Sequence, residues 1–181
     1  MSFFKMTLRS FKDNNLITVS EALDIAEDKT GNFYKFSLGQ WKRHRYDIKT
    51  LSSLKPDEIS DHGFALLNKG SRVINDYDSK TRKHDFYFIC LQDHQILKAL
   101  SRDRNIGLLP LLVYAFTHEL VHIVRFCNFF QRFEIEGENR EKEEEIVHAK
   151  TFEILKDLSL PKLDYVLDLY TGHRICDMAV S

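Results

Sequence analysis

The sequence predicts an α+β fold in which a small mixed or antiparallel sheet packs on one buried helix, followed by C-terminal helices. Three observations support this class. Residues 85–91 are aromatic and apolar throughout, as in a buried strand. Residues 105–130 are apolar on nearly every helical face, which is typical of a central helix. Residues 141–158 begin with a run of acids, which the positive end of a helix dipole favours.

The N-terminal half carries weaker signals. We expect an irregular arm over residues 1–20 and a short capped helix over 20–26. Aromatic and polar residues alternate over 33–38, which predicts a strand. A short helix is expected within 56–68, and a strand within 71–76.

The C-terminal half is clearer. A turn at residues 78–80 would join the strands on either side of it as a hairpin. Pro110 fits the first turn of the central helix. A polar loop is expected over residues 131–140, with the next helix starting at Glu141 or Glu143. The last predicted helix covers residues 163–170, where Gly172 would stop it.

Composition bounds the possible partners and surroundings. The 181 residues suit a single domain, and 26 basic against 27 acidic residues leave the charge near zero. Neither nucleic acid nor a membrane is therefore expected as a partner, and no stretch is apolar enough to span a membrane. Cys90, Cys127 and Cys176 are too scattered for a disulfide framework and are expected to act as small buried hydrophobes. Without a signal peptide, the expected location is the cytoplasm.

The buried helix carries the motif His118-Glu119-Leu120-Val121-His122. At about 100° per residue, His122 falls about 40° from His118, Glu119 about 100° away and Arg125 about 20° to the other side. Nearly all strongly polar residues of this apolar helix thus share one arc of about 120°. Burying ionisable groups is costly unless they are paired or bind a metal, so a shared partner is expected.

Zinc is the partner that this spacing predicts. Histidines at positions i and i+4 point the same way, so both rings can reach one ion. Glu119 is offset from the pair and is placed to act as a general base on a zinc-bound water. We therefore assign His118 and His122 as zinc ligands and Glu119 as the catalytic base, against the alternative of two hydrogen-bonded core histidines.

A third ligand is expected on the following helix, whose candidates are Glu141, Glu143, Glu144, Glu145 and His148. Its apolar residues set a core direction: Ile146, Val147, Phe152, Ile154, Leu155 and Leu158. Glu144 lies about 45° from that direction, Glu143 about 55° and His148 about 85°, with Glu141 and Glu145 farther out. Glu144 is therefore the preferred ligand. His148, one turn later, is the next candidate, or a partner that orients a ligand by hydrogen bonding.

These residues resemble the gluzincins, the thermolysin-like zinc peptidases, which have HExxH on one helix and a Glu ligand on the next. The short chain and the strand before the motif are also similar to the minimal gluzincins and to IrrE-like cytosolic peptidases. The resemblance covers residues 84–160 and implies a zincin-like metallopeptidase core over 84–181, with residues 1–80 of uncertain role. His148 and Val147 depart from the Asp or Asn and the small residue that gluzincins often carry there.

A second resemblance keeps an alternative open. His148-Ala149-Lys150-Thr151-Phe152 is similar to the third-ligand segment of SprT-like metalloproteases, which are DNA-associated and would use His148 as the third ligand. The zinc-ribbon tail that many of them carry is missing. A non-catalytic zinc-binding regulatory module is the third possibility, although such a module does not need Glu119.

The gluzincin resemblance implies hydrolysis of a peptide or protein substrate. Tyr165, Tyr170, His173 and Arg174 are candidates for stabilising the oxyanion. An extended substrate is expected to add to an edge strand near residues 86–91 through main-chain hydrogen bonds, and Arg125 is expected to pair with an acid near the site.

Overall fold

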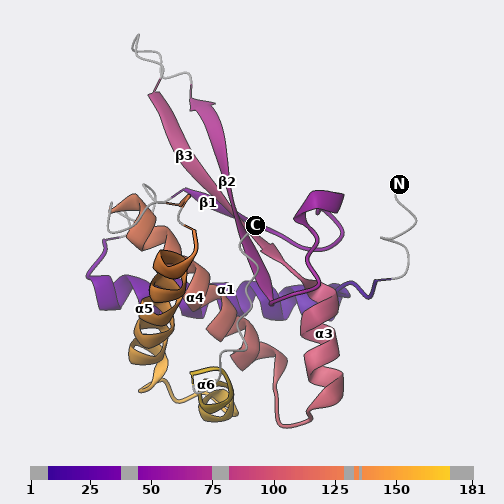
Figure 1. Ribbon diagram of the computed structural model, residues 1–181. Coiled ribbons are helices and arrows are strands. Elements are labelled where there is room, and N and C mark those ends of the chain that lie inside the picture. Colours follow the sequence, from indigo (N-terminus) through magenta and orange to yellow (C-terminus); the bar gives the residue numbers. More distant parts are fainter. Residues whose placement is uncertain (1–7, 38–44, 75–81, 129–132, 135, 172–181) are drawn as a thin grey trace.

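The structure is a computed structural model that describes residues 8–37, 45–74, 82–128, 133–134 and 136–171. In those ranges the chain forms five α-helices, three strands and a single-turn 3-10 helix (Figure 1). The order is α1 (Asp13–Tyr34), β1 (Tyr46–Lys49), η2 (Pro56–Glu58), β2 (Ala65–Ile74), β3 (Arg82–Leu91), α3 (Asp93–Arg102), α4 (Leu108–Cys127), α5 (Glu138–Leu155) and α6 (Leu163–Thr171). The predicted α+β class is confirmed.

The three strands form a mixed sheet in the order β1-β3-β2. β2 and β3 are antiparallel, which confirms the predicted hairpin, and β1 lies parallel to β3 with Ile48 opposite Ile89. Residues 87–90 of β3 are therefore paired on both sides. The edge strands beside residues 86–91 are β1 and β2, so a substrate strand added near these residues would have to pair with one of those two strands. That a substrate adds there stays a prediction.

Residues 86–91 of the central strand β3 pack against a core on both faces of the sheet, which explains their unbroken apolar run. Tyr87, Ile89 and Leu91 point into the main core beside the helices. Phe88 and Cys90 point the other way, into a small second core with Leu51, Leu54 and Leu66. The alternation follows directly from the two-residue period of a strand.

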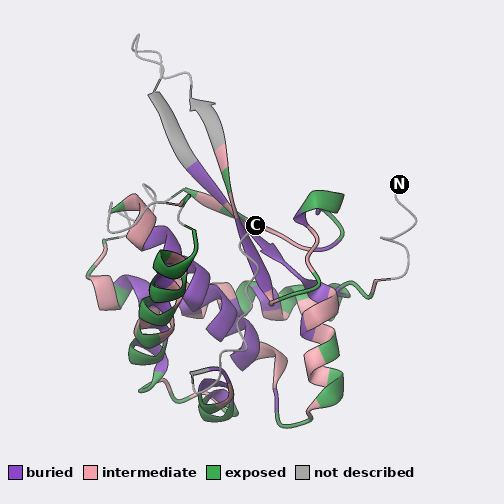
Figure 2. Cartoon of the chain, in the orientation of Figure 1, coloured by how far each residue is buried: buried purple, intermediate pink, exposed green. Residues whose placement is uncertain are grey.

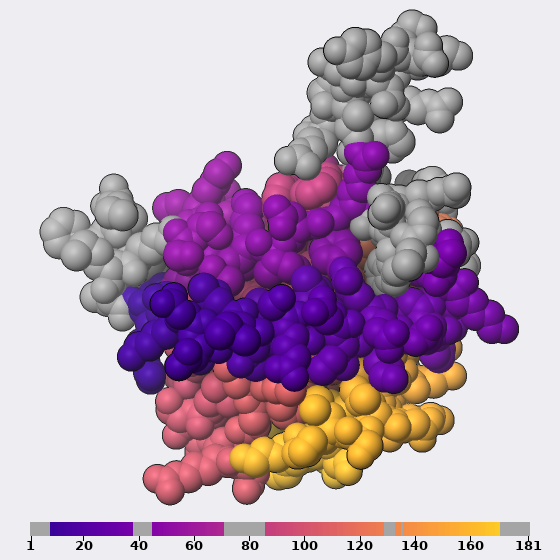
Figure 3. All heavy atoms as spheres, turned by 180° about the vertical axis from the view of Figure 1, so that it is seen from behind, coloured from indigo at the N-terminus to yellow at the C-terminus, as the bar shows by residue number. Residues whose placement is uncertain are grey.

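Helix α4 lies at the centre of the molecule, between α1 on one side and α5 and α6 on the other (Figure 1). Figure 2 shows it buried over nearly its whole length, and every residue from Pro110 to Val124 is buried. Helix α1 crosses the face seen in Figure 3 and covers α4 from behind. The expectation that no stretch is apolar enough to span a membrane is wrong for α4, which is long and apolar enough by length and composition, although 83% of that stretch is buried inside the protein.

The N-terminal predictions need correction. Helix α1 runs from Asp13 to Tyr34, so the predicted arm over 1–20 and short helix over 20–26 are wrong in extent. The strand predicted over 33–38 is also wrong, because Phe33 and Tyr34 end α1 and Lys35 has φ 57°. Packing of α1 against α4 makes this segment helical. An alternation of aromatic and polar residues along the chain carries no information about that packing.

Two further segments differ from expectation. The region 56–68 holds only the turn η2 and the start of β2, which begins six residues before the predicted strand 71–76. Helix α3 was not predicted at all. The predicted turn at 78–80, residue Gly172 and Cys176 lie outside the described residues.

The C-terminal helices agree well with expectation. Helix α4 covers most of the predicted 105–130, and α6 matches 163–170 with one added residue. Helix α5 begins at Glu138, three residues before the first predicted start. Gly137 precedes it with φ 61°, a conformation that glycine adopts without strain.

Candidate metal centre

Helix α4 places His118 and His122 one turn apart on a single face. Their side chains are buried, with relative exposures of 0% and 5%. The two Nε2 atoms lie 3.2 Å apart. The spacing within the motif thus brings both rings together, as the sequence predicts.

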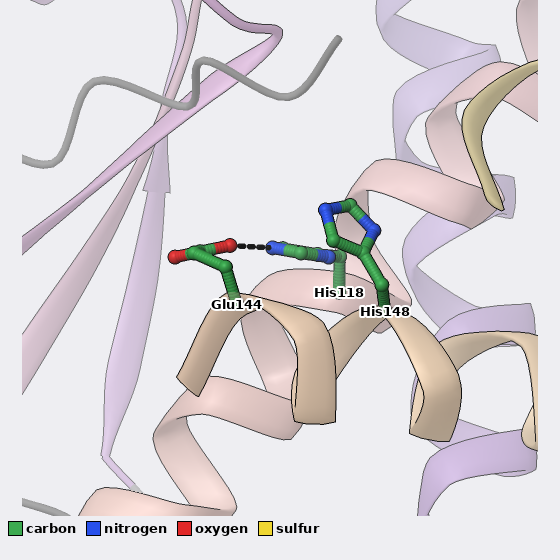
Figure 4. Close-up of side chains that lie close together, drawn as sticks. All are labelled: His118, Glu144 and His148. Atoms are coloured by element: carbon green, nitrogen blue, oxygen red, sulfur yellow. Dashed lines mark hydrogen bonds and ion pairs between the residues drawn. The ribbon is translucent and has the colours of Figure 1, made fainter. Parts of the chain in front are cut away.

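Helix α5 contributes Glu144 to the same point. One carboxylate oxygen lies 3.2 Å from Nε2 of His118, and the other lies 3.2 Å from Nε2 of His122. Figure 4 shows the Glu144 carboxylate directed at the His118 ring from the neighbouring helix. The side chain of Glu144 is 17% exposed, so solvent reaches the group there.

These separations fit a metal centre. Zinc bound tetrahedrally at about 2.0–2.1 Å from each ligand leaves neighbouring donor atoms about 3.3 Å apart. The three donor contacts, each 3.2 Å, match that spacing. Two neutral imidazoles and a carboxylate are also the ligand types that zinc prefers. His118, His122 and Glu144 are therefore spaced as the ligands of a zinc ion would be.

Without a metal, the group holds protons in an uneven way. Burial lowers the pKa of His118 to about 4, so its ring is neutral. Burial also acts to lower the pKa of His122, but the contact with Glu144 outweighs it and the net shift is upward. Burial would raise the pKa of Glu144, yet the two histidines bring it well below the usual range. In the metal-free group, the contacts with Glu144 therefore favour the charged form of His122 and the ionised form of the carboxylate.

Glu119 lies beside this group as a buried carboxyl. It is 2% exposed, and its Oε1 has no hydrogen-bond partner among the residues that the structure describes. Burial raises its pKa to about 7, against the attraction of His122. An unpaired buried oxygen is costly unless a water or ligand satisfies it. A carboxyl that titrates near neutral pH is also suited to accept and return a proton.

The acids next to Glu144 on α5 have different surroundings. Glu143 is buried, but its two oxygens accept hydrogen bonds from Arg125 Nε at 2.6 Å and Nη2 at 2.8 Å. This confirms the predicted pairing of Arg125 with a nearby acid. Glu141 and Glu145 are exposed. Of the candidate acids on α5, only Glu144 meets the two histidines.

His148 lies near the centre as well. Oxygen and nitrogen atoms of Glu144, His118 and His148 all lie within 4.8 Å of one another. However, Nδ1 of His148 is 2.7 Å from the hydroxyl of Tyr114. Tyr114 was not among the predicted site residues, although its position four residues before His118 places it on the same helical face.

Two of the predicted oxyanion candidates, Tyr165 and Tyr170, lie on α6 in the part of the chain that the structure describes. Tyr165 is on α6, 37% exposed, and its hydroxyl donates to Asp103. Tyr170 is buried and stacks on Tyr114, with ring centroids 5.6 Å apart. His173 and Arg174 lie outside the described residues.

The described cysteines are not among the residues that meet at this centre. Neither Cys90 nor Cys127 forms a disulfide. Cys90 is fully buried, as expected of a small hydrophobe, and burial raises the pKa of its thiol to about 12. Cys127 is only half-buried, at the end of α4.

The comparisons with known proteins add no relative to this picture: no family model, no curated protein and no solved structure matches the chain.

Proposed function

We propose that this protein is a zinc-dependent peptidase in which His118, His122 and Glu144 hold the metal and Glu119 is the general base. The observation that carries the proposal is the meeting of three side chains at contacts of 3.2 Å, two Nε2 atoms and the two oxygens of Glu144, beside a buried carboxyl whose Oε1 has no hydrogen-bond partner among the described residues. A core hydrogen-bond cluster would explain the contacts among the three ligands. It would not explain why Glu119 is buried next to them with its Oε1 lacking a hydrogen-bond partner among the described residues.

Zinc held by these ligands supplies Lewis acidity, which activates water and polarises the substrate carbonyl. The residues of the chain do the remaining work. Glu119 accepts the proton of the attacking water at its unpaired Oε1 and returns it to the leaving amine. Its pKa of about 7 suits both directions of transfer, and a bound cation beside it lowers that pKa and favours the base form.

The test begins with the metal. The wild-type protein, purified without chelators, should contain about one zinc ion per chain, in keeping with a three-ligand site. Glu119→Gln keeps the size of the side chain and removes its basicity. We expect it to retain zinc and lose hydrolysis of a mixed peptide library, read by mass spectrometry. Glu145→Gln is the matched control, because Glu145 is an exposed acid on α5.

A non-catalytic zinc module is the competing function. The specific observation in its favour is the nearness of His148, which as a fourth protein ligand would close the centre and leave no position for water. Under this alternative the wild type and Glu119→Gln bind zinc equally and are equally inert on the library. That result would refute the peptidase.

The SprT-like alternative concerns the third ligand. It requires His148 in place of Glu144, so zinc affinity should fall steeply in His148→Ala and hardly change in Glu144→Ala. The geometry favours the reverse order, because Glu144 touches both motif histidines and Nδ1 of His148 is already engaged. Zinc affinity measured for the two variants by competition with a coloured chelator decides between them.

A further inference from the structure

Tyr114 and His148 form a pair that the proposed chemistry does not yet use. Tyr114 lies on α4, one turn before His118, and is fully buried. Its ring stacks nearly parallel on the His148 ring, at 19° and 6.4 Å between centroids. Tyr170 stacks against Tyr114 at 29°. These contacts hold both rings of the pair in place.

The contact between the hydroxyl of Tyr114 and Nδ1 of His148 is 2.7 Å. That length is typical of bonds donated by O–H, whereas bonds donated by N–H to oxygen are usually about 2.9–3.0 Å. A phenol also donates more strongly than it accepts. We therefore take Tyr114 as the donor and Nδ1 as the acceptor. A neutral imidazole that accepts at one nitrogen carries its hydrogen on the other, so Nε2 of His148 bears the hydrogen.

The remaining question is what Nε2 faces. Glu144 and His148 extend from the same side of α5 toward His118 (Figure 4). The rings of His118 and His148 are 4.6 Å apart, and donor atoms of the three residues lie within 4.8 Å. Because Tyr114 engages Nδ1, Nε2 is the nitrogen left for a partner at the centre.

We propose that Nε2–H of His148 donates a hydrogen bond to the carbonyl oxygen of the scissile peptide as that oxygen gains negative charge, and that Tyr114 is the positioning residue that keeps the hydrogen on Nε2. This inference rests on the proposed peptidase function. It gives His148 the role of a catalytic residue that touches substrate, and it assigns the oxyanion donor to α5 instead of α6. It also explains why a tyrosine hydroxyl lies buried one turn from the metal ligands.

The first experiment reads the hydrogen position directly. Histidine nitrogens of the zinc-loaded, 15N-labelled protein are assigned by long-range nitrogen–proton spectra. We expect His148 to carry hydrogen on Nε2 in the wild type and to become a mixture of both forms in Tyr114→Phe. Tyr165→Phe, which removes an exposed hydroxyl bonded to Asp103, should leave His148 unchanged. A hydrogen on Nδ1, or a metal-bound Nε2, in the wild type overturns the proposal.

The second experiment reads catalysis. One oxyanion donor is typically worth 10²–10³ in kcat. We expect His148→Ala to lower kcat by about 100-fold with little change in KM or zinc affinity, and Tyr114→Phe to lower kcat by about tenfold. If the wild type is active and both variants stay within about twofold of it, the donor role fails while the peptidase stands. If the wild type is inert, the peptidase fails first, and the donor role with it.

Discussion

Two buried polar clusters of this protein differ in their hydrogen bonding. The first has hydrogen-bond partners for its buried polar side chains, and the second has buried polar atoms without a partner among the described residues. The first lies at the start of α3. Asp93 is 1% exposed, and its carboxylate accepts the backbone N–H groups of Phe11 at 2.9 Å and Leu51 at 3.0 Å. Gln92, 0% exposed, likewise bonds to the backbone of three residues: Ser60, Glu58 and Cys90.

The second cluster lies between α4 and α5. Nδ1 of His118, Nδ1 of His122 and Oε1 of Glu119 are buried and have no hydrogen-bond partner among the described residues. Its remaining donor atoms converge on one point at 3.2 Å spacing. The cluster at α3 ties the N-terminal segment and the strand connections to the sheet. The cluster at α4 has capacity left for something outside the chain, and this difference separates a structural role from a binding role.

The largest expected effect removes a ligand. Zinc sites of four ligands bind with about 10–16 kcal/mol, so one ligand is worth about 4 kcal/mol at most. His118→Ala should therefore lower zinc affinity roughly 1000-fold, measured by chelator competition. The thermal unfolding of the metal-free protein should hardly change, because an incomplete cluster stabilises the fold little. If His118→Ala instead destabilised the metal-free protein strongly and left zinc binding intact, the cluster at α4 would have a structural role and the comparison would be wrong.

Asp93→Ala should act in the opposite sense. It leaves the buried N–H groups of Phe11 and Leu51 without an acceptor, which costs about 3 kcal/mol of unfolding free energy. Urea denaturation of the metal-free protein measures the loss. Asp157→Ala, at an exposed aspartate, is the control. Zinc affinity of folded Asp93→Ala should stay close to that of wild type. An equal loss of stability in Asp93→Ala and Asp157→Ala would contradict the structural role of Asp93.

The ion pair of Arg125 and Glu143 links the helices that carry the ligands. Arg125→Ala leaves the buried Glu143 carboxylate without its partner and should cost about 2 kcal/mol of stability, less than a fully buried pair because Arg125 is partly exposed. Adding Glu143→Gln removes the stranded charge and should restore part of the loss. Denaturation curves of the single and double variants test this, and identical curves would show that the pair contributes nothing.

The smallest effect is on pH. The contact with Glu144 raises the pKa of His122 in the metal-free protein, against the effect of burial, so zinc must displace a proton that His122 holds closer to neutrality. Zinc affinity should not depend on pH above the pKa of His122, and it should fall about tenfold per pH unit below that pKa. Calorimetry in buffers of different ionisation enthalpy would count the proton released. Zinc binding without proton release would place the proton elsewhere.

Predictability differed between the two halves of the molecule. The apolar run of residues 105–130 predicted α4, because a helix buried on all sides needs no information about its neighbours. The strand expected at 33–38 and the unpredicted α3 show the opposite case. Phe33 and Tyr34 extend α1 against the core, and α3 is a short helix with only Asp93 and Ile96 buried.

For the site residues, too, predictability depended on whether one helix or the packing between two helices sets their positions. The helical wheel for α5 treated Ile146 and Phe152 as core residues, yet they are 41% and 40% exposed. It ranked Glu144 and Glu143 only about 10° apart. The buried one is Glu143, and it pairs with Arg125. The preferred ligand was placed next to both histidines, but the wheel had no means of knowing what the second acid would contact.

By itself the sequence determined the arrangement inside α4, where His118, Glu119 and His122 take fixed positions because one helix sets their spacing and direction. Only the tertiary structure decided how α5 turns against α4, and with that which of its acids reaches the two histidines. The same packing set Tyr114 against His148 and placed β1 over the edge of β3. These contacts join residues far apart in the chain, and their geometry depends on how whole elements pack rather than on local periodicity.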